Sequence, residues 1–365
     1  MRKFVCIPFL SAVLLCGCSN QNKSSIFISE VKELDYGHQA RPKITPIQLD
    51  YSPLGADDLV AFDKYLLFTT NDPSGYIRIY DIDKGTEVAS IVKKGRAANE
   101  LIEHPWTVSE QVYLSDGDII FPVIDDRTLK EINITQSIQK GAAVINASAP
   151  CLFLLDGNTT LIDNDISKTF IYQKPKLHNG ECDPPVFYIQ QAGGEKKIIP
   201  VHKQIMPAGD GVNTEVVVEL YALYMGSIKK HPTKNIIVHS LQNMNYLIFF
   251  DLDNDKCFAV HQKGARTYDD KAEYVPENMT FGDAAVSEDY LFINYRGNIT
   301  AGEQSDKECE VLVFDWSGNY IGGFSSDASL HRLTYSEANK SLYCCNISDE
   351  ILYQIPLSDF LDIHR

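Results

Sequence analysis

The stretch that decides the fold runs over Tyr76–Leu101, YIRIYDIDKGTEVASIVKKGRAANEL. Apolar side chains alternate with polar or aromatic ones in its first half, with Ile77 and Ile79 on one face, and a period of two residues is that of a β-strand. Asp81–Gly85 then supplies turn residues, because Asp bonds to the backbone that follows it and Gly accepts a positive φ without steric cost. The β-rich run Thr86–Val92 comes next, so the stretch predicts an antiparallel hairpin.

Copies of this hairpin recur along the chain. Three clear copies carry an aromatic residue, Asp and then an aliphatic residue or Trp at the strand end, namely Tyr80–Ile82, Phe250–Leu252 and Phe314–Trp316. Three weaker copies fit the remaining intervals, namely Leu129–Asn133, Phe187–Ile189 and Ile351–Ile355. Six units at intervals of roughly 40 to 65 residues match the four-stranded blades of a β-propeller. The sequence therefore predicts an all-β, six-bladed β-propeller, with Asp81, Asp251 and Asp315 at the same strand end in three blades.

The last unit offers only three evident strands, Arg332–Tyr335, Leu342–Asn346 and Ile351–Leu357. A spare strand lies near the other end of the chain, at Ile44–Leu49, and its Pro46 is tolerated only at a sheet edge. A propeller left open exposes unpaired backbone groups. We therefore expect the ring to be closed by Ile44–Leu49, which pairs with Ile351–Leu357 as the outermost strand of the last blade.

The third unit is the least regular. Cys151–Leu155, Thr159–Asp163 and Thr169–Tyr172 are expected strands, and the Pro- and Gly-containing stretch Lys174–Pro185 then interrupts the pattern. Such an insertion on one face of the ring is either a binding loop or an irregular solvated loop. In the fourth unit, Glu215–Leu223 is expected to form the first strand.

The segment after the first hairpin, Gly95–Glu100, has the sequence Gly-Arg-Ala-Ala-Asn-Glu. With this segment and its repeats, the chain resembles the TolB-like six-bladed propeller lipoproteins of bacterial envelopes, in which Gly-Arg-x-x-x-Glu follows the first complete hairpin. The resemblance covers nearly the whole mature chain. Its motifs are structural, so it implies a fold and a compartment rather than an activity.

The first residues have the pattern of an export signal. Arg2 and Lys3 precede the apolar run Phe4–Leu15, and Cys16-Gly17-Cys18 ends it. This is similar to a lipoprotein signal, in which Cys18 becomes the lipidated first residue of the mature chain. An ordinary secretory signal cut nearby is the alternative, because Cys at position 16 is not the usual residue there.

Four regions follow from these patterns. Residues 1–17 are the expected lipoprotein signal peptide, 18–43 a lipidated tether and N-terminal arm, 44–357 the propeller, and 358–365 a C-terminal tail that forms a short helix. The tether lacks an acidic run after Cys18. By analogy with exported lipoproteins, this favours a lipid-anchored protein of the outer membrane that faces the periplasm.

Composition excludes some partners. A chain of 365 residues with 44% hydrophobic residues can bury a large core. Its formal net charge is −16, and removal of Arg2 and Lys3 makes it −18. Such a surface repels phosphate backbones, so no nucleic acid partner is expected. Six cysteines remain after the signal and Cys18, and most are expected to be buried and unpaired.

No catalytic or metal-binding motif stands out. Asp251–Asp255 begins like a calcium loop, but Lys256 and Gln262 stand where such a loop needs Gly and Glu. His104 and His231 each precede Pro and are expected to be turn residues rather than ligands. The sequence therefore predicts no catalytic residues, no metal ligands and no cofactor.

The candidate binding residues are Arg96, Asn99 and Glu100. They lie where the chain crosses from an outer strand to the next inner strand, at a mouth of the central channel, where Arg96 can bind an anion and Glu100 a hydrogen-bond donor. The alternative is that they bond to neighbouring backbone and fix the corner between blades.

Two functions remain open. The first is a non-catalytic, envelope-anchored binding or scaffold propeller that recognises a peptide, glycan or protein partner. The second is a metal-dependent enzyme of the lactonase or hydrolase type with its site in the channel. An apolar and aromatic channel lining favours the first, and acidic or amide oxygens that converge on one point favour the second.

Overall fold

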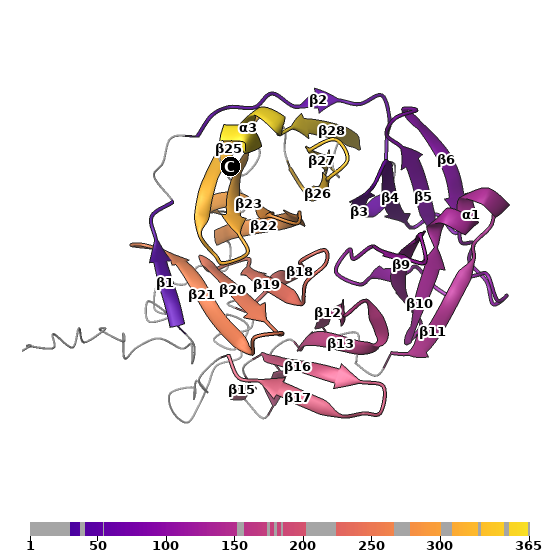
Figure 1. The fold of residues 1–365 in the computed structure, drawn as a ribbon, viewed down its shortest axis with the longest axis horizontal. Coiled ribbons are helices and arrows are strands. Elements are labelled where there is room, and N and C mark those ends of the chain that lie inside the picture. The colour runs from indigo at the N-terminus through magenta and orange to yellow at the C-terminus, as the bar shows by residue number, and fades with distance from the viewer. Residues whose placement is uncertain are drawn as a thin grey trace, which may run out of the picture.

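The structure is a computed structural model. It describes residues 30–36, 41–53, 55–151, 157–173, 176–178, 181–183, 185–201, 224–265, 278–300, 309–327, 330–346 and 350–363. Six β-sheets stand around a common centre like the blades of a fan (Figure 1). The prediction of an all-β, six-bladed β-propeller is confirmed.

Each blade is built outward from the centre in chain order, with antiparallel neighbours. Blade one consists of β3 (Ala56–Phe62), β4 (Tyr65–Thr70), β5 (Ile77–Asp81) and β6 (Thr86–Ile91). Blade two consists of β7 (Trp106–Thr107), β9 (Asp118–Asp125), β10 (Thr128–Asn133) and β11 (Ile145–Pro150), with β8 (Tyr113–Ser115) also paired to β9. Blade three consists of β12 (Gly157–Ile162), β13 (Asp165–Gln173), β16 (Val186–Gln191) and β17 (Lys196–Ile199).

The remaining blades follow the same plan. Blade four consists of β18 (Gly226–Lys230), β19 (Ile236–Leu241), β20 (Tyr246–Asp251) and β21 (Lys256–Gln262). Blade five consists of β22 (Asn278–Val286), β23 (Tyr290–Thr300), β24 (Cys309–Asp315) and β25 (Tyr320–Ser326). Blade six contributes β26 (Arg332–Ser336), β27 (Ser341–Asn346) and β28 (Ile351–Pro356). The innermost strands β12, β18, β22, β26 and β3 contact one another in this order.

The expected equivalence of three aspartates is confirmed. Asp81, Asp251 and Asp315 are the last residues of β5, β20 and β24, which are the third strands of their blades. In each case Oδ1 accepts a hydrogen bond from a backbone N–H of the following turn, at 2.8 to 3.1 Å. The weaker copies form β10, β16 and β28, which are also third strands. The recurring Asp is therefore explained by the turn that it holds.

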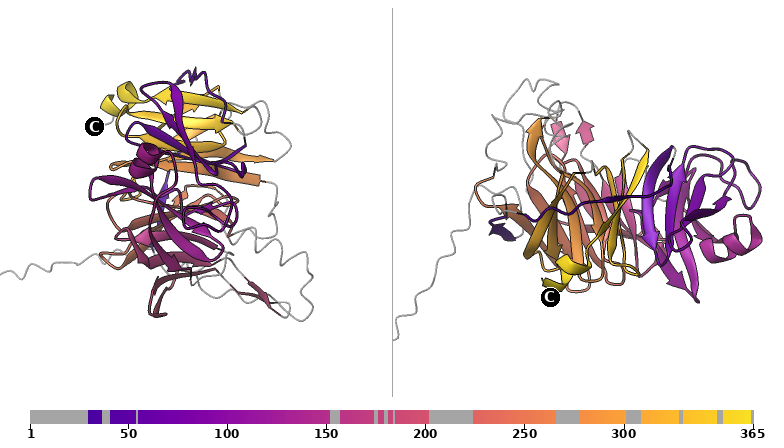
Figure 2. Two further views of the ribbon diagram at one scale, coloured as in Figure 1. Left: turned by 90° about the vertical axis from the view of Figure 1, so that its right-hand side faces the viewer. Right: turned by 90° about the horizontal axis from the view of Figure 1, so that it is seen from above.

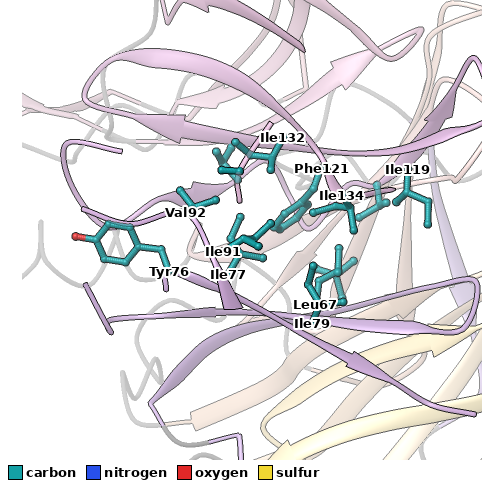
Figure 3. Close-up of a cluster of buried hydrophobic side chains, with 14 of the residues drawn as sticks. Leu67, Tyr76, Ile77, Ile79, Ile91, Val92, Ile119, Phe121, Ile132 and Ile134 are labelled. Atoms are coloured by element: carbon teal, nitrogen blue, oxygen red, sulfur yellow. The ribbon is translucent and has the colours of Figure 1, made fainter. Parts of the chain in front are cut away.

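Apolar faces of neighbouring blades pack against each other. Between blades one and two, Ile77 and Ile79 of β5 lie against Phe121 of β9 and Ile132 of β10, and all four side chains are fully buried (Figure 3). Full burial of a side chain of this size stabilises the fold by about 1.5 to 3 kcal/mol. The alternation recognised in the sequence is thus the contact surface between blades.

A segment before blade one runs around the outside of three blades, and we call residues 30–36 and 41–48 the N-terminal strap (Figures 1 and 2). Its strand β1 (Glu30–Leu34) lies parallel to β21 as a fifth strand of blade four. Tyr36 is fully buried against Phe314 of blade five, and its hydroxyl donates to Asn245 of blade four. Lys43 then forms a bridge with Ser325 of β25.

The strap ends in β2 (Ile47–Gln48), which pairs antiparallel with β28 as the outermost strand of blade six. Leu49 extends the contact, since its N–H donates to the carbonyl of Leu352 at 2.9 Å. This is the pairing expected from the sequence, but its regular part is two residues long. Pro46 has no N–H to donate, which limits the strand at that side.

Some elements differ from the expectation. Residues Ile134–Lys140 form a helix, α1, rather than extending β10. Asn133 caps the start of the helix by accepting a hydrogen bond from Gln136 N, and Gly141 ends it with φ of 63°. The first strand of blade three is β12, which begins at Gly157, and its outer strand is β17. Residues 152–156 of the expected strand Cys151–Leu155 lie outside the described residues.

The expected strand Glu215–Leu223 lies outside the described residues, and the innermost described strand of blade four is β18. The insertion Lys174–Pro185 contains the small hairpin of β14 (Lys176–His178) and β15 (Glu181–Asp183). At the other end of the chain, the expected short helix is present as α3 (Ser358–Ile363).

Among the cysteines of the described ranges, Cys309, Cys344 and Cys345 are free thiols. The adjacent pair in β27 is buried on opposite faces of the strand, in two separate apolar clusters. In the same described ranges, no helix is both long and apolar enough to cross a membrane.

We predict that the strap stabilises the whole ring. A chain that begins at residue 51 loses β1, buried Tyr36 and β2, so its thermal midpoint should fall by about 5 to 10 °C relative to a chain that begins at residue 26. Far-UV circular dichroism melts of both chains measure this. Equal midpoints would show that closure does not depend on the strap.

Candidate functional site

The innermost strands enclose a cavity of about 630 Å³ at the centre of the ring. All six blades contribute to its lining: Asp57, Asp58, Thr107, Asn158, Ser227, Lys229, Asp283 and Arg332 are among the residues on the innermost strands. Neighbouring innermost strands run in one direction, because Arg332 at the start of β26 contacts Asp57, and Ser336 at its end contacts Asp63. The lining residues lie near the starts of β3, β12 and β26, and in β18 they extend from Ser227 to Lys229.

Lys229 of β18 is the centre of a charge cluster that joins three blades. Its Nζ lies 2.6 Å from Oε2 of Glu110 in blade two and 3.1 Å from Oδ1 of Asp283 in blade five. The other carboxylate oxygen of Asp283 accepts a hydrogen bond from Leu333 N in blade six, at 2.9 Å. Because the side chains of Lys229, Glu110 and Asp283 are only 5%, 14% and 6% exposed, this cluster fixes the inner strands relative to one another.

The loop that carries Glu110 has an unusual backbone. Ser109 and Glu110 have φ of 46° and 54°, in the left-handed region that residues with a Cβ rarely adopt. Two bonds hold this loop: Gln111 N donates to the carbonyl of Val108 at 2.9 Å, and Ser109 Oγ donates to the carbonyl of Thr159 at 2.6 Å. Strained backbone that persists beside a cavity is a common feature of binding and active sites.

The protonation of the cluster follows from its burial. Burial raises the pKa of Glu110 to about 8, and although Lys229 lowers it, Asp283 and Asp58 add to the increase. Burial works to lower the pKa of Lys229, but the carboxylates of Asp283 and Glu110 outweigh it and hold that pKa above its ordinary value. Lys229 is therefore charged, and two carboxyl groups share its single positive charge.

On the other side of the cavity, Asp57 and Asp58 begin β3. Oδ2 of Asp58 accepts a hydrogen bond from Thr107 Oγ1 at 2.9 Å, and Arg332 Nη2 lies 3.9 Å from its Oδ1. Arg332 Nε donates to the backbone carbonyl of Asp57 at 2.8 Å. The Asp57 carboxylate accepts from Asn71 Nδ2 at 2.7 Å. These contacts connect blades one, two and six.

The cavity is also lined by Glu103, His104, Pro105 and Trp106, which lead into and begin β7. His104 Nε2 lies 2.8 Å from Oδ2 of Asp57. Trp106 has 62% of its surface exposed although it lines the cavity. A large exposed aromatic side chain beside charged groups is a common feature of binding surfaces.

The residues chosen from the sequence are not part of the cavity lining. Arg96 and Asn99 are exposed, and their binding role stays a prediction. Glu100 turns back on its own loop, where Oε2 accepts a hydrogen bond from Ala97 N at 2.9 Å. A Cβ on Gly95 would lie only 1.8 Å from that oxygen, so a larger residue there would move the Glu100 carboxylate. Glu100 thus makes the backbone contact of the alternative interpretation. Cys18 lies outside the described residues.

The two histidines have different surroundings. His231 is a turn residue as expected, since its Nδ1 accepts hydrogen bonds from Thr233 N and Lys234 N. Its burial lowers its pKa to about 4, so it is neutral in the folded protein at pH 7. His104 instead lines the cavity.

Sequence reasoning missed the cavity residues themselves. Each is a single charged or polar residue in a different repeat, and only the closed ring brings them together. A weak signal was present: Asp57 and Asp283 are charged residues within strands, β3 and β22, that also carry several apolar residues. The lining is polar and charged rather than apolar and aromatic, and its acidic side chains are of the kind expected for the enzyme alternative. Within the described ranges, no three His, Cys, Asp or Glu side chains are arranged to hold a metal ion.

Comparisons with known proteins identify the fold. The sequence matches no protein-family model and no curated protein. Among solved structures, a member of the DUF4221 family from Bacteroides vulgatus superposes with a TM-score of 0.51 at 17% identity, over 87% of this chain and 96% of that one. This similarity concerns the fold alone.

Two further structures are similar at lower scores. Regucalcin from Agrobacterium tumefaciens, described as a calcium-binding protein, has a TM-score of 0.47 and 11% identity over 87% of this chain and 95% of that one. A protein from Bacteroides fragilis that is described as an exported protein has a TM-score of 0.46 and 8% identity. The match covers 90% of this chain and 98% of that one.

We predict that Lys229→Met destabilises the fold by about 3 to 5 kcal/mol at pH 8, because it leaves two buried carboxyl groups without their cation. The loss should be smaller at pH 5. The pKa of Glu110 is raised in the folded protein. The contribution of such a carboxyl group to stability is present below its unfolded pKa and is lost as the pH rises through its folded pKa. Urea unfolding at both pH values measures the difference.

Two variants control this experiment. Lys256→Met changes an exposed lysine and should have little effect at either pH. Glu110→Gln added to Lys229→Met should recover part of the stability at pH 8, since a glutamine can be buried without the proton that Glu110 must take up. A loss of equal size at both pH values, with no recovery in the double variant, would contradict the charge cluster described above.

Proposed function

We propose that this protein is a non-catalytic, envelope-anchored binding or scaffold propeller of the TolB-like kind, which recognises a peptide, glycan or protein partner at the axial cavity. The observation that carries the proposal is the cavity itself. It receives side chains from all six blades, and bonds between blades hold several of them in place. A site that is already formed loses little conformational entropy when a ligand binds.

The size of the cavity supports binding of part of a larger ligand. About 630 Å³ is within the range of roughly 300 to 1,000 Å³ that is typical of ligand pockets. This volume accommodates a long side chain, a chain end or one or two sugar units. The exposed Trp106 offers a flat apolar surface to such a group.

The anchor is the second part of the proposal. Cys18 carries lipid and holds the protein in the outer membrane, with the propeller in the periplasm. The residues between Cys18 and β1 form the tether, and the strap then fixes the chain to blade four at Glu30–Leu34. A ligand would thus be held near the membrane surface.

The alternative is a metal-dependent enzyme of the lactonase or hydrolase type. One observation favours it: Asp57, Asp58, Glu103, Glu110 and Asp283 line the same cavity. Two of these carboxylates are bound to Lys229, whose positive charge opposes a cation beside them. Hydrolysis of a lactone that depends on added Ca²⁺, Mg²⁺ or Zn²⁺ and is lost in Asp58→Asn would favour the enzyme.

A bulky side chain in the cavity should block binding. We predict that Asn158→Trp lowers the affinity for ligands found on peptide and glycan arrays by about tenfold or more, a loss of about 1.4 kcal/mol. Asn99→Trp places the same side chain on the exposed loop outside the cavity and should leave the affinity unchanged. If Asn99→Trp blocks binding and Asn158→Trp does not, the site is the loop that contains Arg96 and Glu100.

Lipidation is tested separately. Cys18→Ala should move the protein from the membrane fraction to a soluble fraction, or leave an uncleaved precursor, because the acyl chains supply the membrane affinity. Fractionation followed by immunoblotting measures this. Normal processing together with full membrane retention would argue against the lipoprotein proposal.

A further inference from the structure

We infer that the ligand of the axial cavity is a peptide or protein segment that places a lysine or arginine side chain in it, where the carboxylates of Asp57, Asp58 and Glu103 bind the positive charge beside Trp106. This inference rests on the proposed binding function and specifies its ligand class.

The first observation is the charge of the lining. Five acidic side chains line the cavity: Asp57, Asp58, Glu103, Glu110 and Asp283. Among the described residues of the lining, Lys229 and Arg332 are the permanent cations. The cavity therefore has an excess of acidic groups, and walls of low dielectric constant strengthen the negative potential inside it.

The second observation is that the two cations already have partners. The ammonium of Lys229 lies within 3.1 Å of both Glu110 and Asp283, so it is fully engaged in the cluster. Arg332 donates a hydrogen bond from Nε to the backbone carbonyl of Asp57, and its Nη2 lies 3.9 Å from the Asp58 carboxylate. An anionic ligand would have to compete with these contacts, whereas a cationic ligand would add to them.

The raised pKa of Glu110 agrees with this picture. Its causes include the charges of Asp283 and Asp58 in addition to burial. A positive charge that enters the cavity would lower that pKa, so binding near pH 8 should release a proton.

The third observation concerns access. The side chains of Asp57 and Asp58 are 45% and 20% exposed, whereas that of Lys229 is 5% exposed. Asp57 and Asp58, which Lys229 does not contact, are thus more accessible than Glu110 and Asp283, which it does contact. They line the cavity together with Trp106, and an indole face attracts an ammonium or guanidinium group. The apolar stem of lysine or arginine can pack on the same ring.

These features favour a basic peptide over a neutral glycan. A neutral sugar does not neutralise the excess negative charge of the carboxylates. Uncompensated charge in a cavity costs stability. A lysine or arginine side chain has both the charge and the length to reach from a segment outside the channel to Asp57 and Asp58.

Titration calorimetry on the soluble mature domain tests the inference. The probes are capped pentapeptides, acetyl-Gly-Gly-X-Gly-Gly-amide, with X as Lys, Arg, Gln or Glu. We expect the Lys and Arg peptides to bind at least about tenfold more tightly than the Gln and Glu peptides. Asp57→Asn/Asp58→Asn keeps the shape and the acceptor oxygens and should lower the affinity for the Lys peptide about tenfold or more.

The control must separate the cavity from the overall negative charge of the protein. Asp83→Asn/Asp116→Asn removes two exposed carboxylates in hairpin turns outside the cavity, and so changes the net charge by the same amount. It should change the affinity less than twofold. Trp106→Phe should bind more tightly than Trp106→Ala, because it keeps an aromatic face.

Three outcomes would overturn the inference. The first is equal binding of all four peptides, and the second is no binding of the Lys and Arg peptides. The third is an equal loss of affinity in the cavity and control variants, which would show that binding depends on the general surface charge. The proposed function fails separately. If a neutral or anionic ligand binds and Asn158→Trp blocks it, the cavity is a binding site for another ligand class, and if no ligand depends on Asn158, the binding function itself is wrong.

Discussion

A ring of sheets has to close, and in this protein the closing contact is the pairing of β2 with β28. A blade that lacked its outermost strand would leave a row of backbone N–H and carbonyl groups unpaired at a sheet edge. The closing pair is short, with Ile47 opposite Gln354 and Gln48 opposite Tyr353. It is held in place by the strap that precedes it, whose Tyr36 is buried between blades four and five. The geometry of the cavity depends on this closure, since its lining comes from both sides of the junction.

The inner strands connect the fold to the site. In most of the blade interfaces apolar side chains meet, but near the axis the strands carry charged residues that contact each other from different blades. Lys229 joins three blades through Glu110 and Asp283, and Arg332 joins blade six to blade one. Removal of one member leaves the others buried without a partner, so stability and the shape of the site are coupled. The same side chains therefore act in folding and in the electrostatics of the cavity.

The sequence predicted the parts of the fold that local chemistry controls. Asp81, Asp251 and Asp315 hold turns within a few residues, so the repeat was visible without a structure. Helix α1 was not predicted, because Leu129–Asn133 has the pattern of a strand and Asn133 at its end also caps the helix that follows. The strand β18, Gly-Ser-Ile-Lys-Lys, was missed because its residues face a polar cavity and do not alternate in the usual way. The site itself is formed by residues from different repeats, and one sequence gives no information on which of them meet.

The order of attachments along the strap has a mechanical consequence. Force applied to the chain ahead of Glu30 acts first on β1, which is hydrogen-bonded along blade four over five residue pairs. Tyr36 and the bridge at Lys43 come next, and β2 is reached last. The short closing pair is therefore shielded from tension by the longer strand before it. A tethered propeller of this design would yield first at blade four, while the ring remained closed.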